Sequence, residues 1–413
     1  MVPSARLPGT SDGDEDAIVC HVDMDCFYAA CERLREPALR GEPLVVGMGY
    51  EPGETHGAVA TASYEAREFG VESAMAISEA LERLPRKVDV AGTDHPVSEA
   101  GFYRPVDLEF YESVASEVKG ILHDVADTVR EVSVDEAYLD VTSHTEWETV
   151  DTFAMTLKTR IQETVGVTAS VGVAPTMSAA KVASDRDKPD GLVVVEPGEV
   201  QSFFEPLPVE EVHGVGPVTA AEFGELGIET AGDLAQADPR MLEDRFGERG
   251  VQVRRYARGE DSRAVEPRGK PKSFSRESAF TDPTTDENRQ TEQIRSLATA
   301  VAERADSRSV LYRTIGIKVV EPPFEVHTRE RTLPGPIEDA DVVREVAAEL
   351  FEEFAGEPVR KLGVRVSNLS FADETQPSLS EWDDETAPGA SHSTSKSSPD
   401  SSGPRQRSLS EFE

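Results

Sequence analysis

The sequence predicts a multidomain α+β protein, with a mixed sheet-and-helix segment, a helical segment and a second α/β segment. The chain has 413 residues, enough for several domains at roughly 100 to 200 residues each. In its first half, strand and helix periodicities alternate in the order β-α-β-β-α-β, which is typical of a ferredoxin-like fold. A stretch containing Pro, Gly and Arg over residues 259–272 then separates two parts with different patterns.

The β-α-β-β-α-β order emerges when residues 27–92 are treated as an insertion into the sheet. Strands are expected over 17–22, 128–134, 137–141 and 168–173, and helices over 103–126, 150–165 and 176–187. The insertion carries strand signals at 43–48 and 57–62 and helix signals at 26–36, 63–69 and 76–84. In this topology the end of the first strand lies beside the turn between the second and third strands. We therefore expect Asp23 to meet Asp135 and Glu136 at one sheet edge.

The remaining segments differ in composition. Residues 188–258 are helical in pattern and punctuated by glycine, and residues 273–371 alternate strands at 313–320 and 361–367 with helices at 291–305 and 340–355. Residues 1–16 are acidic, and residues 372–413 are rich in Ser, Asp, Glu and Pro. Both ends are expected to be disordered, because such segments lack the apolar residues that a core needs.

The charge balance is strongly acidic. The 79 acidic residues outnumber the 42 Lys and Arg residues, for a formal net charge of −37, which by itself argues against a nucleic-acid partner. However, the acids are spread along the chain, as suits a protein that stays hydrated in molar salt. We therefore hypothesise a halophilic source. At about 1 M salt the Debye length is only about 3 Å, so local basic patches would decide contact with nucleic acid.

Several classes of protein are disfavoured. No apolar run approaches the roughly 18 residues of a membrane span, and the acidic N-terminus does not resemble a signal peptide. We expect a soluble, cytoplasmic protein with no membrane partner. The three cysteines, Cys20, Cys26 and Cys31, lack CxxC spacing and a distant partner cluster, so we expect them to be reduced and buried rather than in a disulfide or a zinc site.

Three acids at one sheet edge suggest a metal site. Like charges a few ångströms apart raise each other's pKa unless a cation neutralises them. Mg²⁺ prefers oxygen ligands, so the carboxylates of Asp23, Asp135 and Glu136, with the main-chain carbonyl of Met24, could hold two Mg²⁺ ions and catalyse in-line displacement at phosphorus. The alternative is that an Asp-Glu pair at a turn is simply solvated surface.

Three sequence strings favour the metal site over solvated surface. They are HVDMDCFYAA (21–30), AVATASYEAR (58–67) and SVDEAYLD (133–140). In residue identity, order and spacing they resemble the signature segments of Y-family DNA polymerases, most closely those of the DNA polymerase IV (DinB) branch. The resemblance covers residues 17–371. It implies a right-hand polymerase with a ferredoxin-like palm (17–26 and 93–187), small fingers (27–92), a helical thumb (188–258), a basic linker (259–272) and an α/β little finger (273–371).

The resemblance also implies roles for individual residues. Asp23, Asp135 and Glu136 match the metal ligands, and Tyr28 matches the steric gate that leaves no room for a ribose 2′-hydroxyl. The nucleotide-binding positions are Phe27, Thr61, Tyr64, Arg67 and Lys188. On a helix, Tyr64 and Arg67 share a face, and an Arg fork suits phosphate. The plainer alternatives are a core tyrosine for Tyr28, a structural Thr61, and solvated cations for Arg67 and Lys188.

Two segments are expected to contact DNA. The string VHGVGP (212–217) resembles a helix-hairpin-helix, in which Gly214 and Gly216 let the main chain approach a phosphate. Residues 254–272 contain seven basic residues and only three acids. In an acidic chain this local reversal of charge suggests phosphate contact. The candidates are Arg254, Arg255, Arg258, Lys270 and Lys272. An ordinary helical turn and a solvated linker are the alternatives.

The extreme C-terminus reads QRSLSEF (406–412). Gln406, Leu409 and Phe412 resemble a sliding-clamp-binding peptide, although Glu413 replaces the usual second aromatic residue. Such a peptide would fold on contact and place its apolar side chains in a pocket.

Two classes of function remain. The first is a monomeric, low-fidelity translesion DNA polymerase that uses primed template DNA, deoxynucleoside triphosphates and Mg²⁺. No stretch resembles a proofreading exonuclease, and the fingers segment is small for a tight closure over the nascent base pair. The second is a non-catalytic DNA-binding protein that is tethered to the clamp. The presence of all three acids favours the first.

Overall fold

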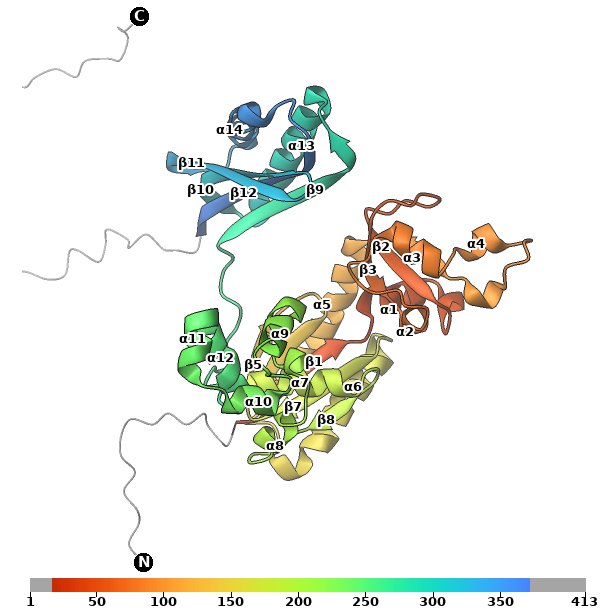
Figure 1. The fold of residues 1–413 in the computed structure, drawn as a ribbon, viewed down its shortest axis with the longest axis vertical. Helices are drawn as coiled ribbons and strands as arrows, with labels where there is room; N and C mark the ends of the chain where they lie inside the picture. The colour runs from red at the N-terminus through yellow and green to blue at the C-terminus, as the bar shows by residue number, and fades with distance from the viewer. Residues whose placement is uncertain (1–16, 372–413) are drawn as a thin grey trace, which may run out of the picture. The chain divides into compact units, whose positions relative to one another are not determined.

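The computed structural model describes residues 17–371, which divide into two compact units, one up to Lys270 and one from Pro271 (Figure 1). The division lies inside the linker expected over 259–272. Among the described residues, no helix is both long and apolar enough to cross a membrane.

The first unit is built around a five-stranded sheet in the order β5-β6-β1-β7-β8. The strands are β1 (Val19–Met24), β5 (Thr128–Glu131), β6 (Glu136–Asp140), β7 (Ala169–Ala174) and β8 (Leu192–Val194). Four of them follow the expected β-α-β-β-α-β order, with β1 antiparallel to both β6 and β7. The expected sheet lacked β8, a three-residue strand parallel to β7 that is too short to give a periodic signal.

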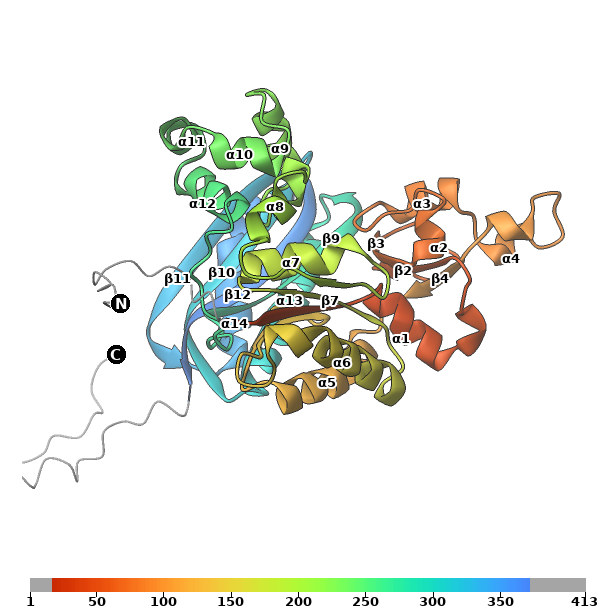
Figure 2. The same cartoon turned by 90° about the horizontal axis from the view of Figure 1, so that it is seen from below.

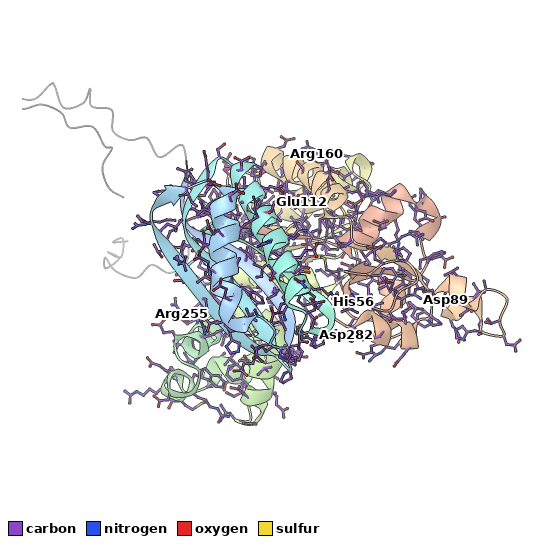
Figure 3. The ribbon with its side chains drawn as sticks, turned by 90° about the horizontal axis from the view of Figure 1, so that it is seen from above. His56, Asp89, Glu112, Arg160, Arg255 and Asp282 are labelled. Carbon is purple, nitrogen blue, oxygen red and sulfur yellow. The ribbon has the colours of Figure 1, made fainter. Side chains whose placement is uncertain are left out.

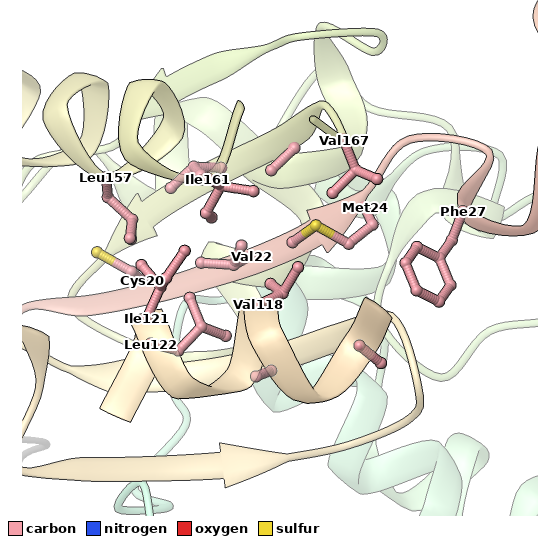
Figure 4. Close-up of a cluster of buried hydrophobic side chains, with 14 of the residues drawn as sticks. Cys20, Val22, Met24, Phe27, Val118, Ile121, Leu122, Leu157, Ile161 and Val167 are labelled. Atoms are coloured by element: carbon pink, nitrogen blue, oxygen red, sulfur yellow. The ribbon is translucent and has the colours of Figure 1, made fainter. Parts of the chain in front are cut away.

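Helices cover both faces of this sheet. Helices α5 (Leu108–Val125) and α6 (Val150–Thr164) lie on one face and α7 (Met177–Arg186) lies on the other (Figure 2). Successive side chains of a strand point to opposite faces. Cys20, Val22 and Met24 are therefore buried with the α5 and α6 side chains (Figure 4), while His21 and Asp23 face α7. The polar face of β1 is thus directed at α7.

For the helix expected over 103–126, the predicted start was wrong. Residues Phe102–Pro105 form β4, and the helix begins only at Leu108, where the Asp107 side chain accepts a hydrogen bond from Phe110 N (3.1 Å). Pro105 explains the difference, because proline has no N–H and disfavours helical backbone in the residue before it.

Strand β4 belongs to a second, three-stranded sheet in the order β3-β2-β4. It pairs in parallel with β2 (Leu44–Met48), which is antiparallel to β3 (Ala58–Ala62). The small sheet therefore extends past the boundary expected at residue 92. Its helices are α1 (Phe27–Arg35), α2 (Tyr64–Arg67), α3 (Ile77–Arg83) and α4 (Lys87–Val90), the last marked by Asp89 in Figure 3.

After β8 the chain is helical, as predicted. The elements are α8 (Val200–Phe204), α9 (Pro217–Gly224), α10 (Ala231–Gln236), α11 (Pro239–Phe246) and α12 (Glu248–Ala257). Their apolar side chains share a core with those of α7, for example Phe204 and Phe223 with Ala180. The helical segment is therefore packed against the same helix that faces Asp23.

The second unit is a four-stranded antiparallel sheet in the order β11-β10-β12-β9 with two long helices. Its elements are β9 (Ser273–Thr284), α13 (Glu287–Asp306), β10 (Val310–Glu321), β11 (Glu325–Ile337), α14 (Ala340–Phe351) and β12 (Val359–Phe371). Apolar residues of both helices and of the sheet form one core. The two expected strands and the two expected helices are present as β10, β12, α13 and α14, whereas the expectation did not name β9 and β11.

Candidate active site

The backbone brings the three predicted acids to one edge of the large sheet. Asp23 is the register partner of Glu136 across β1 and β6, and Met24 N donates a hydrogen bond to Asp135 O (3.0 Å). The turn between β5 and β6 is closed by hydrogen bonds from Val132 N and Ser133 N to Glu136 O. The expected meeting of the end of β1 with this turn is confirmed.

Two lysines lie among these acids. Lys188 Nζ is 2.9 Å from Asp23 Oδ1, and Lys181 Nζ is 3.6 Å from Asp23 Oδ2 and 3.2 Å from Glu136 Oε2. The Asp135 carboxylate instead accepts a hydrogen bond from Ser133 Oγ. Within residues 17–371, three ligand atoms all within 4.8 Å of one another occur only at Glu321, Glu325 and His327 in the second unit. The three predicted acids are thus adjacent without converging on one point.

Burial and charge oppose each other at this edge. Burial raises the pKa of Asp23, and the neighbouring Lys188 and Lys181 only partly offset this effect. For both lysines, burial alone would lower the pKa, but the surrounding carboxylates outweigh it and raise the pKa. Both lysines are therefore held as cations.

The donor set fits a divalent metal. Its carboxylate oxygens are hard ligands of the kind that Mg²⁺ prefers. In their present arrangement, the Lys181 ammonium contacts both the Asp23 and the Glu136 carboxylates and offsets part of their negative charge, and Lys188 contacts Asp23 as well.

Tyr28 lies in the first turn of α1 and is half-buried. Its ring stacks on the buried Tyr111 of α5, with centroids 4.6 Å apart and planes 22° apart. Burial, and then the nearby Asp135, raise the pKa of Tyr28, so its phenol stays neutral. The neighbouring Phe27 side chain is in the core, 2% exposed, so only its main chain could reach a ligand. The expected nucleotide contact of Phe27 is corrected to that extent.

The other predicted nucleotide-binding residues come from separate elements. Tyr64 and Arg67 share a face of α2, with the Arg67 guanidinium 4.8 Å from the Tyr64 ring centroid. Arg67 Nε donates a hydrogen bond to Ala62 O (3.1 Å), which holds one edge of the guanidinium group in place. Thr61 is half-buried in β3, opposite Val46 of β2. Lys188 follows α7 and is bound to Asp23.

Several residues of this site were not predicted from the sequence. The buried Asp25 accepts hydrogen bonds from Tyr64 Oη (3.1 Å), Ser170 Oγ (2.9 Å) and Asp190 N (2.8 Å), and so joins β1, α2 and the segment after α7. Asp25 and Ser133 both stand inside the signature strings, so their positions in the sequence could have indicated them. Lys181 and Asp185 carry no such signal, because in the sequence they form an ordinary pair four residues apart on a helix.

The predicted hairpin at residues 212–217 precedes α9. Gly214 has a φ of 93°, a conformation that favours glycine. Its carbonyl oxygen accepts a hydrogen bond from Arg249 Nη2 (2.6 Å). Gly216 is the N-cap of α9, and a Cβ added there would meet nothing within 4 Å. The main chain at Gly216 is therefore open to a ligand.

The predicted basic strip is partly engaged with the protein itself. Arg254 Nε donates to Ala237 O (2.8 Å), and Arg258 pairs with Glu260 (2.6 Å). Arg255 is exposed on α12 and is marked in Figure 3. Lys270 and Lys272 are exposed in the linker. The predicted clamp-binding residues Gln406, Leu409 and Phe412 lie outside the residues that the structure describes.

A ferredoxin-like sheet with acids at the junction of β1 and β6, together with a helix-hairpin-helix segment, fits a nucleic-acid polymerase. The chain belongs to the Y family of DNA polymerases, in the DNA polymerase IV branch. Residues 22–185 match the impB/mucB/samB family, residues 271–379 its C-terminal domain, and residues 197–228 the helix-hairpin-helix (HHH) motif of the IMS family.

Individual relatives agree with this assignment. The chain is 60% identical to a DNA polymerase IV of Halobacterium salinarum over 379 residues, covering 92% of this chain and 91% of that protein. A chimera of the Y-family DNA polymerases Dbh and Dpo4 is 30% identical, with a TM-score of 0.74, covering 86% and 99% of the two chains. An insertion ternary complex of Dbh DNA polymerase is 28% identical, with a TM-score of 0.60 and the same coverage.

Proposed function

We propose that this Y-family DNA polymerase extends a primer 3′-hydroxyl on damaged templates with low fidelity, and that Asp23, Asp135 and Glu136 hold two Mg²⁺ ions for the transfer. The single observation that carries the proposal is the pairing of Asp23 with Glu136 across β1 and β6, with Asp135 bound to the next residue of β1. When bound, the ions would supply Lewis-acid stabilisation of the attacking and leaving oxygens.

The chain's own residues would do the remaining work. The carboxylates of Asp23, Asp135 and Glu136 and the main-chain carbonyl of Met24 are the proposed ligands. Lys188 and Arg67 would bind the triphosphate, with Thr61, Tyr64 and the Phe27 main chain lining its site. Lys188 already contacts Asp23, and Arg67 belongs to α2, whose Tyr64 donates a hydrogen bond to Asp25 directly after β1. Phosphoryl transfer depends mostly on such positioning and charge stabilisation.

Selection of the sugar is assigned to Tyr28. Its half-buried ring is held by stacking on Tyr111, so it cannot easily move aside for a 2′-hydroxyl. Low fidelity is attributed to the small insertion that carries the fingers, because its short helices α1 to α4, of four to nine residues, offer little surface for a tight closure over the base pair.

Contact with duplex DNA is assigned to the Gly214–Gly216 hairpin and to Arg254, Arg255, Arg258, Lys270 and Lys272. We also propose that Gln406, Leu409 and Phe412 bind a sliding clamp, and that the enzyme acts as a cytoplasmic monomer in a halophile. At high salt, where charges are screened within about 3 Å at 1 M, such local cations can act despite a net charge of −37.

The test is primer extension with Mg²⁺ and deoxynucleotides at high KCl. The isosteric variants Asp135→Asn and Glu136→Gln remove one charge each and are expected to lower the extension rate at least about 100-fold while still binding primed DNA. Asp124→Asn is the matched control, because Asp124 is an exposed acid of α5 whose partner is Arg160. It should leave the rate unchanged.

The outcomes separate the two classes of function. If the parent binds primed DNA but does not extend it under any divalent metal, the non-catalytic alternative holds for this chain. If the parent extends primers and both variants do so equally well, the proposed ligand set is wrong.

A further inference from the structure

The Lys181 ammonium contacts three carboxylates at once. Its ammonium nitrogen lies 3.2 Å from Glu136, 3.6 Å from Asp23 and 3.5 Å from Asp185. The side chain is only 22% exposed. Lys181 thus fills the space between two proposed metal ligands and is enclosed by a third carboxylate.

Asp185 completes this cluster from the same helix. It lies one turn after Lys181 on α7 and contacts both Lys181 and Lys188, the latter at 2.7 Å. Asp185 is in turn 46% exposed, so it is the outer member of the group. Three carboxylates and two ammonium groups therefore alternate, with Asp185 holding both cations from the solvent side.

The position of Lys181 is fixed by the packing of α7 on the sheet. A Cβ at Gly172 of β7 would lie 2.1 Å from Ala180 O and 2.2 Å from Ser184 N, so the helix backbone touches the strand. His21 Nδ1 and Ser184 Oγ, 2.7 Å apart, link the same helix to β1. Lys181, between these contacts, has little freedom to leave, whereas Lys188 lies beyond the end of α7.

We propose that Lys181, held by Asp185, is a positioning residue that acts as a built-in counter-cation. It keeps Asp23 and Glu136 side by side in the free enzyme and weakens metal binding until the phosphates of a nucleotide add further ligands. This inference rests on the proposed metal ligands. A fixed positive charge a few ångströms from a divalent ion repels it, while a nearby carboxylate attracts it. Lys181 and Asp185 must therefore shift metal affinity in opposite directions.

The experiment measures Mn²⁺ binding to the full chain by electron paramagnetic resonance, at one fixed KCl concentration and without DNA or nucleotide. The double variant Asp23→Asn/Glu136→Gln defines the background from other surface acids and is subtracted. Lys181→Met, which keeps the length and apolar stem of the side chain, is expected to tighten site-specific binding about threefold to tenfold. Asp185→Asn is expected to weaken it by a similar factor, and Lys181→Met/Asp185→Asn to return it to within about twofold of the parent.

Stability gives a second readout that does not depend on activity. Without metal, Lys181→Met should unfold at a lower temperature than the parent, because Asp23 and Glu136 then repel each other. Adding Mn²⁺ should raise the unfolding temperature of Lys181→Met by more than it raises that of the parent. Lys119→Met is the control, since it removes a lysine whose partner is Glu131, away from the cluster. It should change neither quantity.

Each outcome decides one point. If both single variants weaken Mn²⁺ binding, or neither changes it, the counter-cation role is refuted. If the Asp23→Asn/Glu136→Gln protein binds Mn²⁺ as the parent does, the proposed metal ligands fail instead, whatever Lys181 does.

Discussion

The carboxylate of Asp261 accepts a hydrogen bond from the main-chain N–H of Ser178 (3.0 Å), although 83 residues separate them. Ser178 stands in the first turn of α7, where the helix dipole favours a negative charge. Arg263 donates three further hydrogen bonds to the same carboxylate, two from its guanidinium at 2.8 and 2.7 Å and one from its main-chain N–H at 3.2 Å. The linker after α12 is thereby attached to the helix that carries Lys181 and Asp185.

Asp261→Asn is expected to destabilise the first unit by about 1–3 kcal/mol at pH 7, because a buried charged hydrogen-bond acceptor is lost. The hydrogen bonds from Arg263 and Ser178 outweigh burial and lower the pKa of Asp261. The stabilisation is therefore complete above the unfolded pKa of about 3.9 and is lost as pH falls through the lower folded pKa. Thermal unfolding of the two proteins should differ at pH 7 and converge below about pH 4; a constant difference would contradict this account.

Gly172→Ala is expected to destabilise the protein by about 2–3 kcal/mol, because the new methyl group would collide with the backbone of α7. Gly120→Ala is the matched control. Gly120 is an exposed residue inside α5 with nothing within 4 Å of an added Cβ, so alanine should stabilise by about 0.5–1 kcal/mol. Chemical denaturation measures both. Equal effects would show that α7 can shift without cost.

Tyr28→Ala is expected to raise ribonucleotide incorporation severalfold or more, because the ring would no longer fill the space beside the sugar. Tyr28→Phe keeps that ring and its stacking on Tyr111, so sugar discrimination should be retained. Single-nucleotide insertion with matched deoxy- and ribonucleotides measures the ratio. Unchanged discrimination in Tyr28→Ala would rule out the gate.

Arg255→Gln is expected to weaken binding of primed DNA and to reduce the slope of log affinity against log salt by about 0.9, the value for one phosphate contact. Arg160→Gln is the control, because Arg160 lies on α6 and pairs with Asp124 (2.6 Å). Fluorescence anisotropy over a range of KCl concentrations gives both slopes. Equal slopes for the two variants would remove Arg255 from the proposed DNA contacts.

Much of the fold was predictable because its signals are local. Alternating apolar residues identify β1, and the order of strands places Asp23 beside Asp135 and Glu136. Strand β4 was missed because its pairing with β2 is parallel and distant, and the helical pattern of α5 continued into it. Three-residue strands such as β8 carry too few residues for any periodicity to show.

Most of the candidate site was predictable where its residues stand in the three continuous strings. The three acids, Tyr28 and Arg67 do so. Lys181 does not, because its contact with Glu136 depends on which face of α7 meets the sheet, and that is set by the packing of Gly172 rather than by the residues around position 181. Asp25 stands in the first string, but its structural role could not be predicted there because its partners, Ser170 and Asp190, lie 145 and 165 residues away.

Tyr111, which supports the ring of Tyr28, is itself held from behind, since its hydroxyl donates a hydrogen bond to Glu32 Oε1 at 2.7 Å. Tyr111 is completely buried and never meets a nucleotide. If Tyr28 selects the sugar, that selectivity depends on the buried residues that hold its ring in place. Natural variation at positions 32 or 111 would then retune the choice between ribose and deoxyribose while leaving every substrate-facing side chain intact.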